Sequence, residues 1–418
     1  MIQSASITTI APRDSFALTN PRMLWCIHGD EVYGVRRATL GMARCLSESG
    51  VTVIFAAMQG GTFAAELTRQ GHQLVVLGRR RVVGLERSGL RYLHSVMRLV
   101  IDAAATSASF RKAIQTLRPQ WIHIRNNNLL LSTALAAAMT STPVYWHLPN
   151  TIRSKLPLDL QPMGYRFLCR ICGVRALANS IHTARSLAGA RSNTRVLYPG
   201  LDSEHFSSSA DFRHFRREEF QIHPRLPVLL VMARVIPDKA QDRVIEAVID
   251  LLNSGTQLVL FIVGGPTDSA FFQLLTHRVT SAGVSDLIRL IGPVDDPRPY
   301  YHLCDIVINS RTKAEPFGLS IVEAMLMQRP VLAYAPGGPS ETILDGSTGW
   351  LIHDASPAGY RQGIYRALSD VDRWQEMGAH ARQRAIECFS LQQTCREYVR
   401  LLESDGLLAT RQLSYSEQ

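Results

Sequence analysis

Short apolar runs alternate with longer helical patterns along most of this 418-residue chain, and the pattern restarts near residue 228. Such alternation is typical of βα units and a parallel sheet. The expected strands are residues 23–27, 51–56, 74–77, 121–124, 144–147 and 175–178 in the first half, and 228–233, 258–263, 287–291, 306–308, 331–333 and 349–352 in the second. The sequence therefore predicts an α/β protein with two doubly wound, Rossmann-like domains.

A change of composition separates the two series of strands. Tyr198-Pro-Gly200, a run of serines and a charged patch suit a linker, which we place at 201–215. The predicted domains are then 23–200 and 216–385, and we expect a helix at about 386–403 to pack back on the first domain. Two such sheets would face each other across a cleft, with ligands bound beyond the carboxyl ends of their strands.

Residues 1–22 are rich in Ser and Thr and lack the continuous apolar core of a secretory signal, so we expect a flexible lead-in. The longest stretch without charged side chains, 126–151, contains Pro143 and several hydroxyl side chains. A helix followed by a strand explains it better than a membrane span. We therefore expect a cytoplasmic protein.

The charge balance and the cysteines exclude some classes of protein. Forty-five basic and 35 acidic residues leave a net charge of +10, which favours an anionic partner without choosing between a nucleotide, a lipid, a membrane surface and a nucleic acid. Seven scattered cysteines fit reduced thiols better than a disulfide framework. No second pair completes a zinc site with Cys169 and Cys172, so these are predicted to be small buried side chains.

The segment Glu315-Pro-Phe-Gly-Leu-Ser-Ile-Val-Glu323 is the most informative motif. Gly318 lets a ligand approach the backbone, and the amides of Gly318 to Ile321 would form a helix N-terminus that attracts an anion. The two carboxylates would lie before and behind that anion, as required to hold both ends of a sugar nucleotide. An alternative is a surface acid plus an ordinary early-helix glutamate.

Two cations follow the first strand of the second domain. Arg234 and Lys239 lie in the loop after residues 228–233, where they can face a diphosphate through charge-assisted hydrogen bonds. The alternative is that both are solvated loop charges.

The first domain offers weaker signals. The turn His28-Gly-Asp-Glu-Val-Tyr-Gly34 lacks the spacing of a dinucleotide fingerprint, which disfavours a nicotinamide dehydrogenase. His147 ends a predicted strand and can face the same cleft, although a single histidine at a strand end is more often a structural residue.

These segments together resemble the retaining glycosyltransferases of family 4, which have the GT-B fold. The resemblance extends from Met23 to about Leu402 and is most specific in the two glutamates, the Arg and Lys pair and Ile291-Gly-Pro-Val-Asp-Asp296. Ala233 and Ala240 depart from the family pattern, because glycine commonly stands at both positions.

The resemblance implies a role for each matched residue. It places donor contacts at the nucleotide, the diphosphate and the sugar, and it implies neither a divalent metal nor a cofactor. The implied catalytic residues are His147, which would face the sugar, Arg234 and Lys239, which would hold the diphosphate, and Glu315, which would hold sugar hydroxyls. The implied donor-binding residues are Gly34, Val294, Phe317, Gly318, Leu319, Ser320 and Glu323, the last of them at the ribose.

The implied reaction is transfer of a hexose from a nucleotide diphosphate sugar, most often a UDP-sugar such as UDP-glucose, to a glycan or lipid-linked acceptor in cell-surface polysaccharide assembly. Departing diphosphate would gain charge in the transition state, so positive potential would supply catalysis. A UDP-sugar 2-epimerase of the same fold and a catalytically silent sugar-nucleotide sensor or scaffold are the alternatives. A glycosidase would leave Arg234 and Lys239 without a purpose.

Arginines interleaved with apolar residues characterise the segment from Arg79 to Arg118. This segment resembles the surface by which membrane-associated family members approach lipid-linked acceptors, and anionic headgroups attract such cations. We therefore expect peripheral contact with the inner face of the cytoplasmic membrane, against the alternative of a solvated helix face. Nucleic-acid binding is disfavoured, because no aromatic platform accompanies the arginines.

Overall fold

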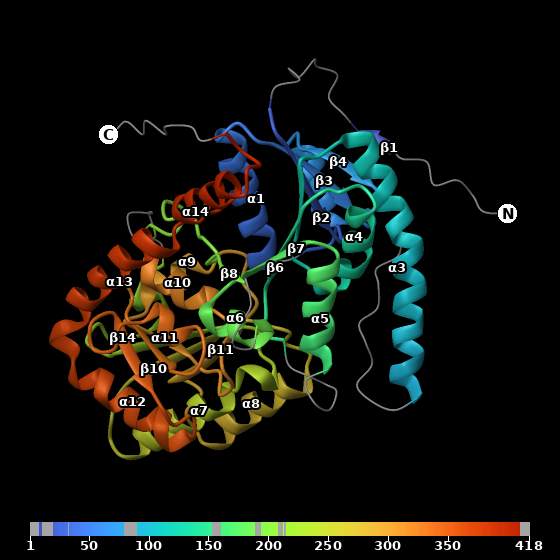
Figure 1. The fold of residues 1–418 in the computed structure, drawn as a ribbon. Coiled ribbons are helices and arrows are strands. Elements are labelled where there is room, and N and C mark those ends of the chain that lie inside the picture. The colour runs from blue at the N-terminus through green and yellow to red at the C-terminus, as the bar shows by residue number, and fades with distance from the viewer. Residues whose placement is uncertain are drawn as a thin grey trace. The chain divides into compact units, whose positions relative to one another are not determined.

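The computed structural model describes residues 8–10, 20–31, 33–78, 90–152, 160–188, 194–207, 212 and 215–409. The chain forms two compact units (Figure 1). Unit 1 comprises Met1–Gly200 and Thr394–Gln418, and unit 2 comprises Leu201–Gln393. All twelve predicted strands are present, with ends that differ by at most one residue.

Unit 1 is built on an eight-stranded sheet of order β1-β4-β3-β2-β5-β6-β7-β8, parallel except for β1. Its strands are β1 (Thr8–Ile10), β2 (Arg22–Ile27), β3 (Thr52–Ala57), β4 (Gln73–Val76), β5 (Trp121–Ile124), β6 (Val144–Leu148), β7 (Val174–Ala178) and β8 (Arg195–Val196). Its helices are α1 (Tyr33–Glu48), α2 (Thr62–Arg69), α3 (Leu90–Leu117), α4 (Asn127–Ala138), α5 (Leu160–Ile171), α6 (Ile181–Ala188) and most of α14 (Leu391–Ser404).

Alternate residues of these strands pack into two layers of helices, as the period of a strand requires. Leu24, Ile54, Ile122 and Trp146 point into the layer under α3, α4 and α5. Trp25 and its same-face neighbours point to the opposite side, where Figure 1 shows α1 and α14. Tyr398 of α14 reaches this face, and its hydroxyl accepts a hydrogen bond from the Trp121 indole at 3.2 Å.

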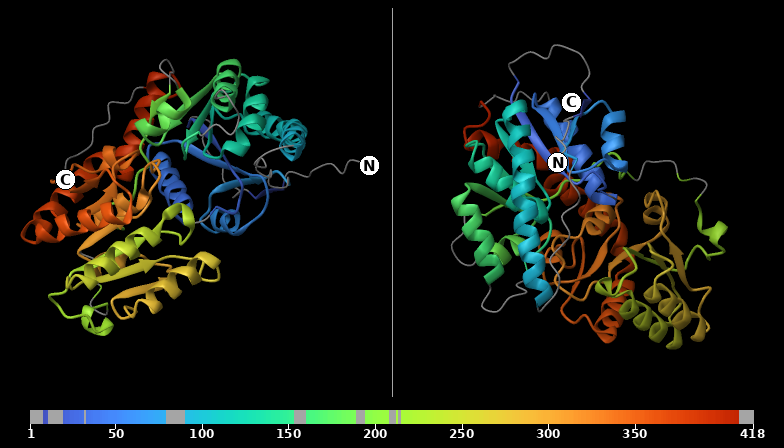
Figure 2. Two further views of the ribbon diagram at one scale, coloured as in Figure 1. Left: turned by 90° about the horizontal axis from the view of Figure 1, so that it is seen from below. Right: turned by 90° about the vertical axis from the view of Figure 1, so that its right-hand side faces the viewer.

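Unit 2 contains a wholly parallel sheet of order β11-β10-β9-β12-β13-β14, with helices on both faces (Figure 2). Its strands are β9 (Val228–Met232), β10 (Val259–Val263), β11 (Ile288–Gly292), β12 (Ile306–Asn309), β13 (Val331–Tyr334) and β14 (Gly349–Ile352). Its α-helices are α7 (Gln241–Asn253), α8 (Ala270–Ser281), α9 (Arg298–Leu303), α10 (Leu319–Leu326), α11 (Pro339–Thr342), α12 (Pro357–Ser369) and α13 (Trp374–Phe389). Short 3₁₀ helices are η3 (Arg217–Phe220), η4 (Pro237–Lys239) and η5 (Val371–Arg373).

The structure differs from the predicted organisation in three details. The helix expected at 386–403 is divided, because Ser390 is extended and its side chain caps α14 by accepting from the Gln393 amide. The predicted linker includes ordered residues of unit 2, since Leu201 pairs with Phe389 and Phe206 is fully buried. β1 lies within the expected lead-in and pairs antiparallel with β4.

The cysteines and the helices bear on two further expectations. All seven cysteines are free, and Cys169 and Cys172 pack against the core of unit 1. In the described part of the chain, no helix is both long enough and apolar enough to cross a membrane. Of the basic segment, residues 79–89 lie outside the described residues. The remainder is α3, with exposed Arg98 and Lys112, followed by the exposed Arg118.

Candidate active site

The functional residues predicted in unit 2 lie beyond the carboxyl ends of its parallel strands. Arg234 follows β9, Val294 follows β11, and Glu315 follows β12. Neighbouring β9 and β12 form the switch point of this sheet, because the chain proceeds from β9 to β10 on one side and places β12 on the other. Open α/β sheets bind ligands at such a point.

Lys239 and Glu315 meet across this switch point. The Lys239 ammonium lies 2.8 Å from one oxygen of Glu315, and the Arg311 guanidinium lies 3.2 Å from the other. Only 10% of the Glu315 side chain is exposed, against 23% for Lys239 and 14% for Arg311. Each carboxylate oxygen therefore faces its own cation in a largely buried setting, where ion pairs are stronger than at the surface.

Asp238 extends this cluster toward the surface. Its two oxygens lie 2.8 Å from Arg311 and 3.0 Å from Lys313. Partial burial acts to raise the pKa of Asp238, but the hydrogen bond from Lys313 and the neighbouring cations lower it overall. Three cations thus face two carboxylates, which leaves the cluster with an excess positive charge.

Backbone contacts hold the loop that carries Lys239. The Ser310 hydroxyl donates to the Lys239 carbonyl at 2.6 Å, and the Gln241 amide donates to the Arg234 carbonyl at 2.8 Å. Ala240 has a left-handed conformation with φ 51°, which explains why glycine suits this position. The Arg234 side chain is exposed and pairs with no carboxylate among the described residues.

The Glu315 loop leads into α10 through Gly318, whose φ is 94°. A Cβ atom there would lie 2.7 Å from the Ile321 Cδ1 atom, so both the backbone and the packing require glycine. The Ile321 amide donates to the Gly318 carbonyl at 3.0 Å. The expected anion cradle is therefore shorter than predicted, because it excludes Ile321 and keeps the amides of Gly318, Leu319 and Ser320.

Two other members of the motif are anchored by aromatic side chains. Phe317 is buried, and its ring lies 5.6 Å from that of Phe389. The Tyr301 hydroxyl donates to a Glu323 oxygen at 2.8 Å, which orients this half-buried carboxylate in the middle of α10. Phe317 thus contributes packing here, and the roles implied for its neighbours remain predictions.

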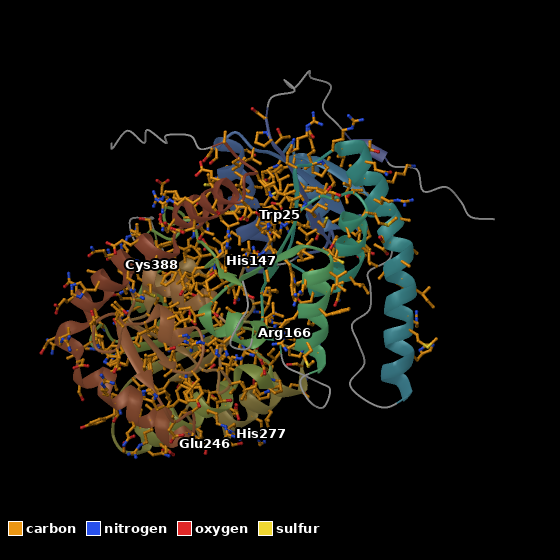
Figure 3. The ribbon with its side chains drawn as sticks, viewed as in Figure 1. Trp25, His147, Arg166, Glu246, His277 and Cys388 are labelled. Atoms are coloured by element: carbon orange, nitrogen blue, oxygen red, sulfur yellow. The ribbon has the colours of Figure 1, made fainter. Side chains whose placement is uncertain are left out.

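The remaining predicted residues belong to unit 1. Gly34 is the second residue of α1, and His147 is the penultimate residue of β6. His147 is 4% exposed, and burial together with the charges of Arg125 and His123 holds its pKa well below the ordinary value. Its Nε2 atom has no hydrogen-bond partner among the described residues (Figure 3 shows the side chain). The Nδ1–H group of His147 therefore donates to the backbone of Leu197. The Nε2 atom is then able to accept a hydrogen bond from a hydroxyl.

Sequence reasoning missed Arg311, although the signal was present. Arg311 follows a predicted strand, as Arg234 does, and the same argument about strand ends applies to both. It also missed Gly337 and Gly338, which support the motif from β13. A Cβ atom at Gly337 would lie 2.3 Å from the Glu315 carbonyl oxygen, so this loop can approach Glu315 only without a side chain.

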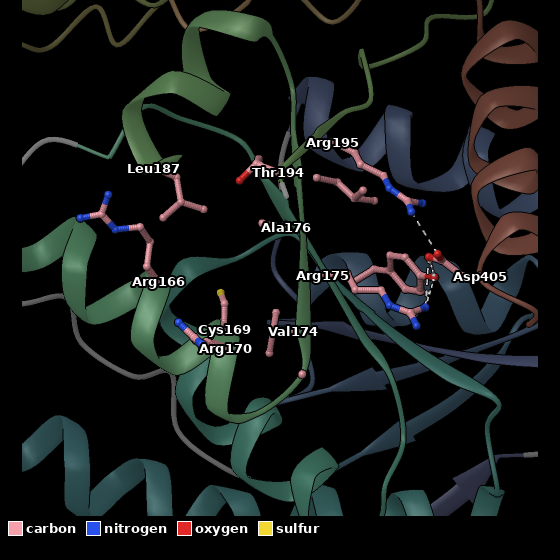
Figure 4. A pocket seen from close by; sticks show the side chains of 13 residues that line it. Arg166, Cys169, Arg170, Val174, Arg175, Ala176, Leu187, Thr194, Arg195 and Asp405 are labelled. Carbon is pink, nitrogen blue, oxygen red and sulfur yellow. Dashed lines mark hydrogen bonds and ion pairs between the residues drawn. The ribbon is translucent and has the colours of Figure 1, made fainter. Parts of the chain in front are cut away.

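A separate cavity lies in unit 1 and contains none of the predicted residues. It measures about 950 Å³ and lies between α5 and two strands, β7 and the edge strand β8 (Figure 4). Arg175 and Arg195 line one side and both pair with Asp405, at 3.1 and 3.2 Å. Arg166 and Arg170 of α5 line the other side.

Two curated proteins resemble about half of this chain. A D-inositol 3-phosphate glycosyltransferase of Nocardia farcinica is 31% identical over 50% of this chain and 48% of its own length. A GDP-mannose-dependent alpha-(1-6)-phosphatidylinositol monomannoside mannosyltransferase of Mycolicibacterium smegmatis is 28% identical over 46% of this chain and 51% of its own. The matched region thus spans about half the length of these relatives.

Solved structures extend the likeness to nearly the whole chain. A glycosyltransferase from Rickettsia africae covers 94% of this chain with all of its own, at a TM-score of 0.78 and 18% identity. Anabaena Alr3699/HepE in complex with UDP and glucose covers 92% with all of its own, at 0.73 and 19%. Residues 212–384 match the family described as Glycosyl transferases group 1. This segment therefore resembles a group 1 glycosyltransferase domain, and the chain as a whole has the GT-B fold.

Proposed function

We propose that this protein is a retaining, metal-independent glycosyltransferase that transfers a hexose from a nucleotide diphosphate sugar to a glycan or lipid-linked acceptor. The observation that carries the proposal is the cluster of Lys239, Arg311 and Glu315 at the switch point of unit 2. Its excess positive charge lies beside the turn at Gly318. A leaving diphosphate gains charge as the sugar departs, and preorganised cations stabilise that charge.

Each side chain has a proposed role that suits its chemistry. Lys239 and Arg311 would bind the diphosphate, and the amides following Gly318 would bind its oxygens. Glu323, oriented by Tyr301, would accept from the ribose hydroxyls. Glu315 would be released from its cations when the diphosphate binds, which frees its carboxylate for sugar hydroxyls. His147 would contribute its Nε2 atom as a hydrogen-bond acceptor.

We propose UDP as the nucleotide and cell-surface polysaccharide assembly as the setting. The complexes of Anabaena Alr3699/HepE with UDP and with UDP-glucose support this choice, because that protein shares the fold. The Mycolicibacterium smegmatis relative uses GDP-mannose, so GDP is the competing nucleotide. Relatives named for inositol 3-phosphate and phosphatidylinositol monomannoside extend the acceptor class to phosphorylated cyclitols and their lipids.

Calorimetric titration of UDP, GDP and ADP in the presence of a chelator tests the donor site. Lys239→Ala should weaken the preferred nucleotide at least tenfold, which corresponds to about 1.4 kcal/mol. Lys313→Ala is the matched control, because Asp238 is the only described residue that pairs with Lys313, whose side chain is 54% exposed. Binding that requires a metal, or an equal loss in both variants, would contradict the proposal.

We also propose that α3 brings unit 1 to an anionic membrane surface. Met97 and Ile101 are each 64% exposed and lie one turn apart, beside the exposed Arg98. Apolar and cationic side chains on one exposed helix suit an interfacial contact. Sedimentation with vesicles, with and without anionic lipid, tests this contact, and equal sedimentation with both would refute it.

A further inference from the structure

Arg125 is a partly buried cation at the ligand-binding edge of unit 1, and it has no hydrogen-bond or ion-pair partner among the described residues. It directly follows β5, and the described residues offer its guanidinium neither a hydrogen bond nor an ion pair. Burial lowers the pKa of Arg125 to about 10, so the arginine remains charged at neutral pH while lacking full hydration. A charge in such a setting is costly unless a ligand compensates it.

The sheet register places Arg125 beside His147. Ile124, the last residue of β5, is paired with Trp146 of β6. The residues that follow this pair along the chain are Arg125 and His147. Paired residues of parallel strands project to the same face. The electrostatic effect of Arg125 on the pKa of both His123 and His147 agrees with this proximity.

None of the ion pairs within the described part of the chain includes Arg125. The nearest acidic segment along the edge follows β2, where the Glu31 carboxylate accepts from the amides of His28 and Gly29 at 2.7 and 2.9 Å. The 12-residue α4 begins just after Arg125, with Asn126 as its N-cap. The positive end of its dipole adds to the positive potential.

We propose that Arg125 binds a phosphate-bearing group of the acceptor, so that the acceptor hydroxyl lies near His147. This inference rests on the proposed function, which it deepens by naming a specificity-determining residue and the acceptor class. The planar guanidinium suits a phosphate through two parallel hydrogen bonds. A soluble sugar phosphate and a phospholipid headgroup share this chemistry.

Titration of inorganic phosphate into the UDP-saturated protein tests the site, because UDP occupies the competing cations of unit 2. Arg125→Gln should weaken phosphate binding at least tenfold, and Arg125→Lys should weaken it less. Arg69→Gln is the matched control, since Arg69 is an exposed residue of α2 in the same unit. Equal phosphate affinity in Arg125→Gln and wild type would overturn the proposal.

A second arm distinguishes the two sources of phosphate. Sedimentation with phosphatidylcholine vesicles that contain phosphatidylglycerol should depend on Arg125 if the acceptor is a lipid. Phosphate binding without such dependence supports a soluble acceptor. If UDP fails to bind, the phosphate titration is repeated in a Lys239→Ala background, which removes a competing cation of unit 2. The anion site at Arg125 is then tested even if the transferase proposal fails.

Thermal unfolding separates binding from a structural role. Because Arg125 pairs with no other described residue, Arg125→Gln should leave the melting temperature unchanged or raise it. The proposal would be overturned if Arg125→Gln lowered the melting temperature and Arg69→Gln weakened phosphate binding to the same degree. That result would show that Arg125 acts on the fold.

Discussion

Replacement of Glu315 by Gln tests whether this carboxylate competes with the donor diphosphate for Lys239 and Arg311. The substitution keeps the shape of the side chain and removes its charge. Two charge-assisted contacts are weakened, at 2.8 Å from Lys239 and 3.2 Å from Arg311. Each such hydrogen bond contributes about 1.5–3 kcal/mol.

The net loss of stability is smaller than the sum of the two contacts. The Gln oxygen still accepts one hydrogen bond, and partly exposed Lys239 and Arg311 recover some hydration. We expect a loss of about 1–3 kcal/mol in the free energy of unfolding. For a unit of this size the melting temperature should fall by about 2–4 °C for each kcal/mol.

The same change should strengthen UDP binding, because the diphosphate no longer competes with Glu315 for Lys239. We expect UDP to bind about three- to tenfold more tightly, equivalent to roughly 0.7–1.4 kcal/mol. UDP should therefore restore more of the melting temperature in the variant than in wild type. Turnover should fall, since Glu315 is expected to hold the sugar.

Glu323→Gln is the matched comparison. Its carboxylate accepts from the Tyr301 hydroxyl and is expected to bind the ribose, so this variant should bind UDP more weakly. The two glutamates of one motif are thus predicted to affect UDP affinity in opposite directions. Calorimetry on both variants checks this, and equal weakening of UDP in both would refute the idea that Glu315 neutralises the phosphate-binding cations.

Two further predictions concern the geometry and the charge of the same cluster. Gly318→Ala should destabilise the protein by about 1 kcal/mol more than Gly255→Ala. Both glycines have a positive φ near 90°, but of the two only Gly318 lacks room for a methyl group. Denaturant titration of the two variants measures the difference. Asp238→Asn should remove stability that wild type has above pH 3.8 and loses as the pH falls through the lowered pKa of Asp238. Denaturation midpoints of the two proteins should therefore converge in acid, and a constant gap down to pH 3 would contradict the assignment.

The strands were predictable from sequence because a buried parallel strand is a short apolar run between breakers. The division near Ser390 was harder, because α13 and α14 form an almost continuous helical pattern. Only the extended conformation of one residue separates them. That break allows Tyr398 to pack on the sheet of unit 1, a contact between residues 277 positions apart that no local pattern reveals.

The candidate site was predictable where a motif fixes the backbone and unpredictable where partners come from separate loops. Gly318 could be inferred, since a strand-to-helix turn between two glutamates needs a flexible residue. Arg311 escaped notice because its contact with Glu315 depends on how the loop between β12 and α10 folds, and Lys239 reaches the same carboxylate from the loop after β9.

Arg125 shows the complementary case, in which an absent contact is informative. In the sequence it is one arginine among many, and neither its spacing nor its neighbours distinguish it. Only the fold shows that it follows β5 beside His147 and that no described carboxylate pairs with it. An arginine that pairs within the protein stabilises the fold, whereas a partly buried arginine without a partner favours a bound anion. The comparison of Arg311 with Arg125 therefore separates two uses of positive charge: one held by carboxylates until a diphosphate arrives, the other open to a phosphate on the acceptor.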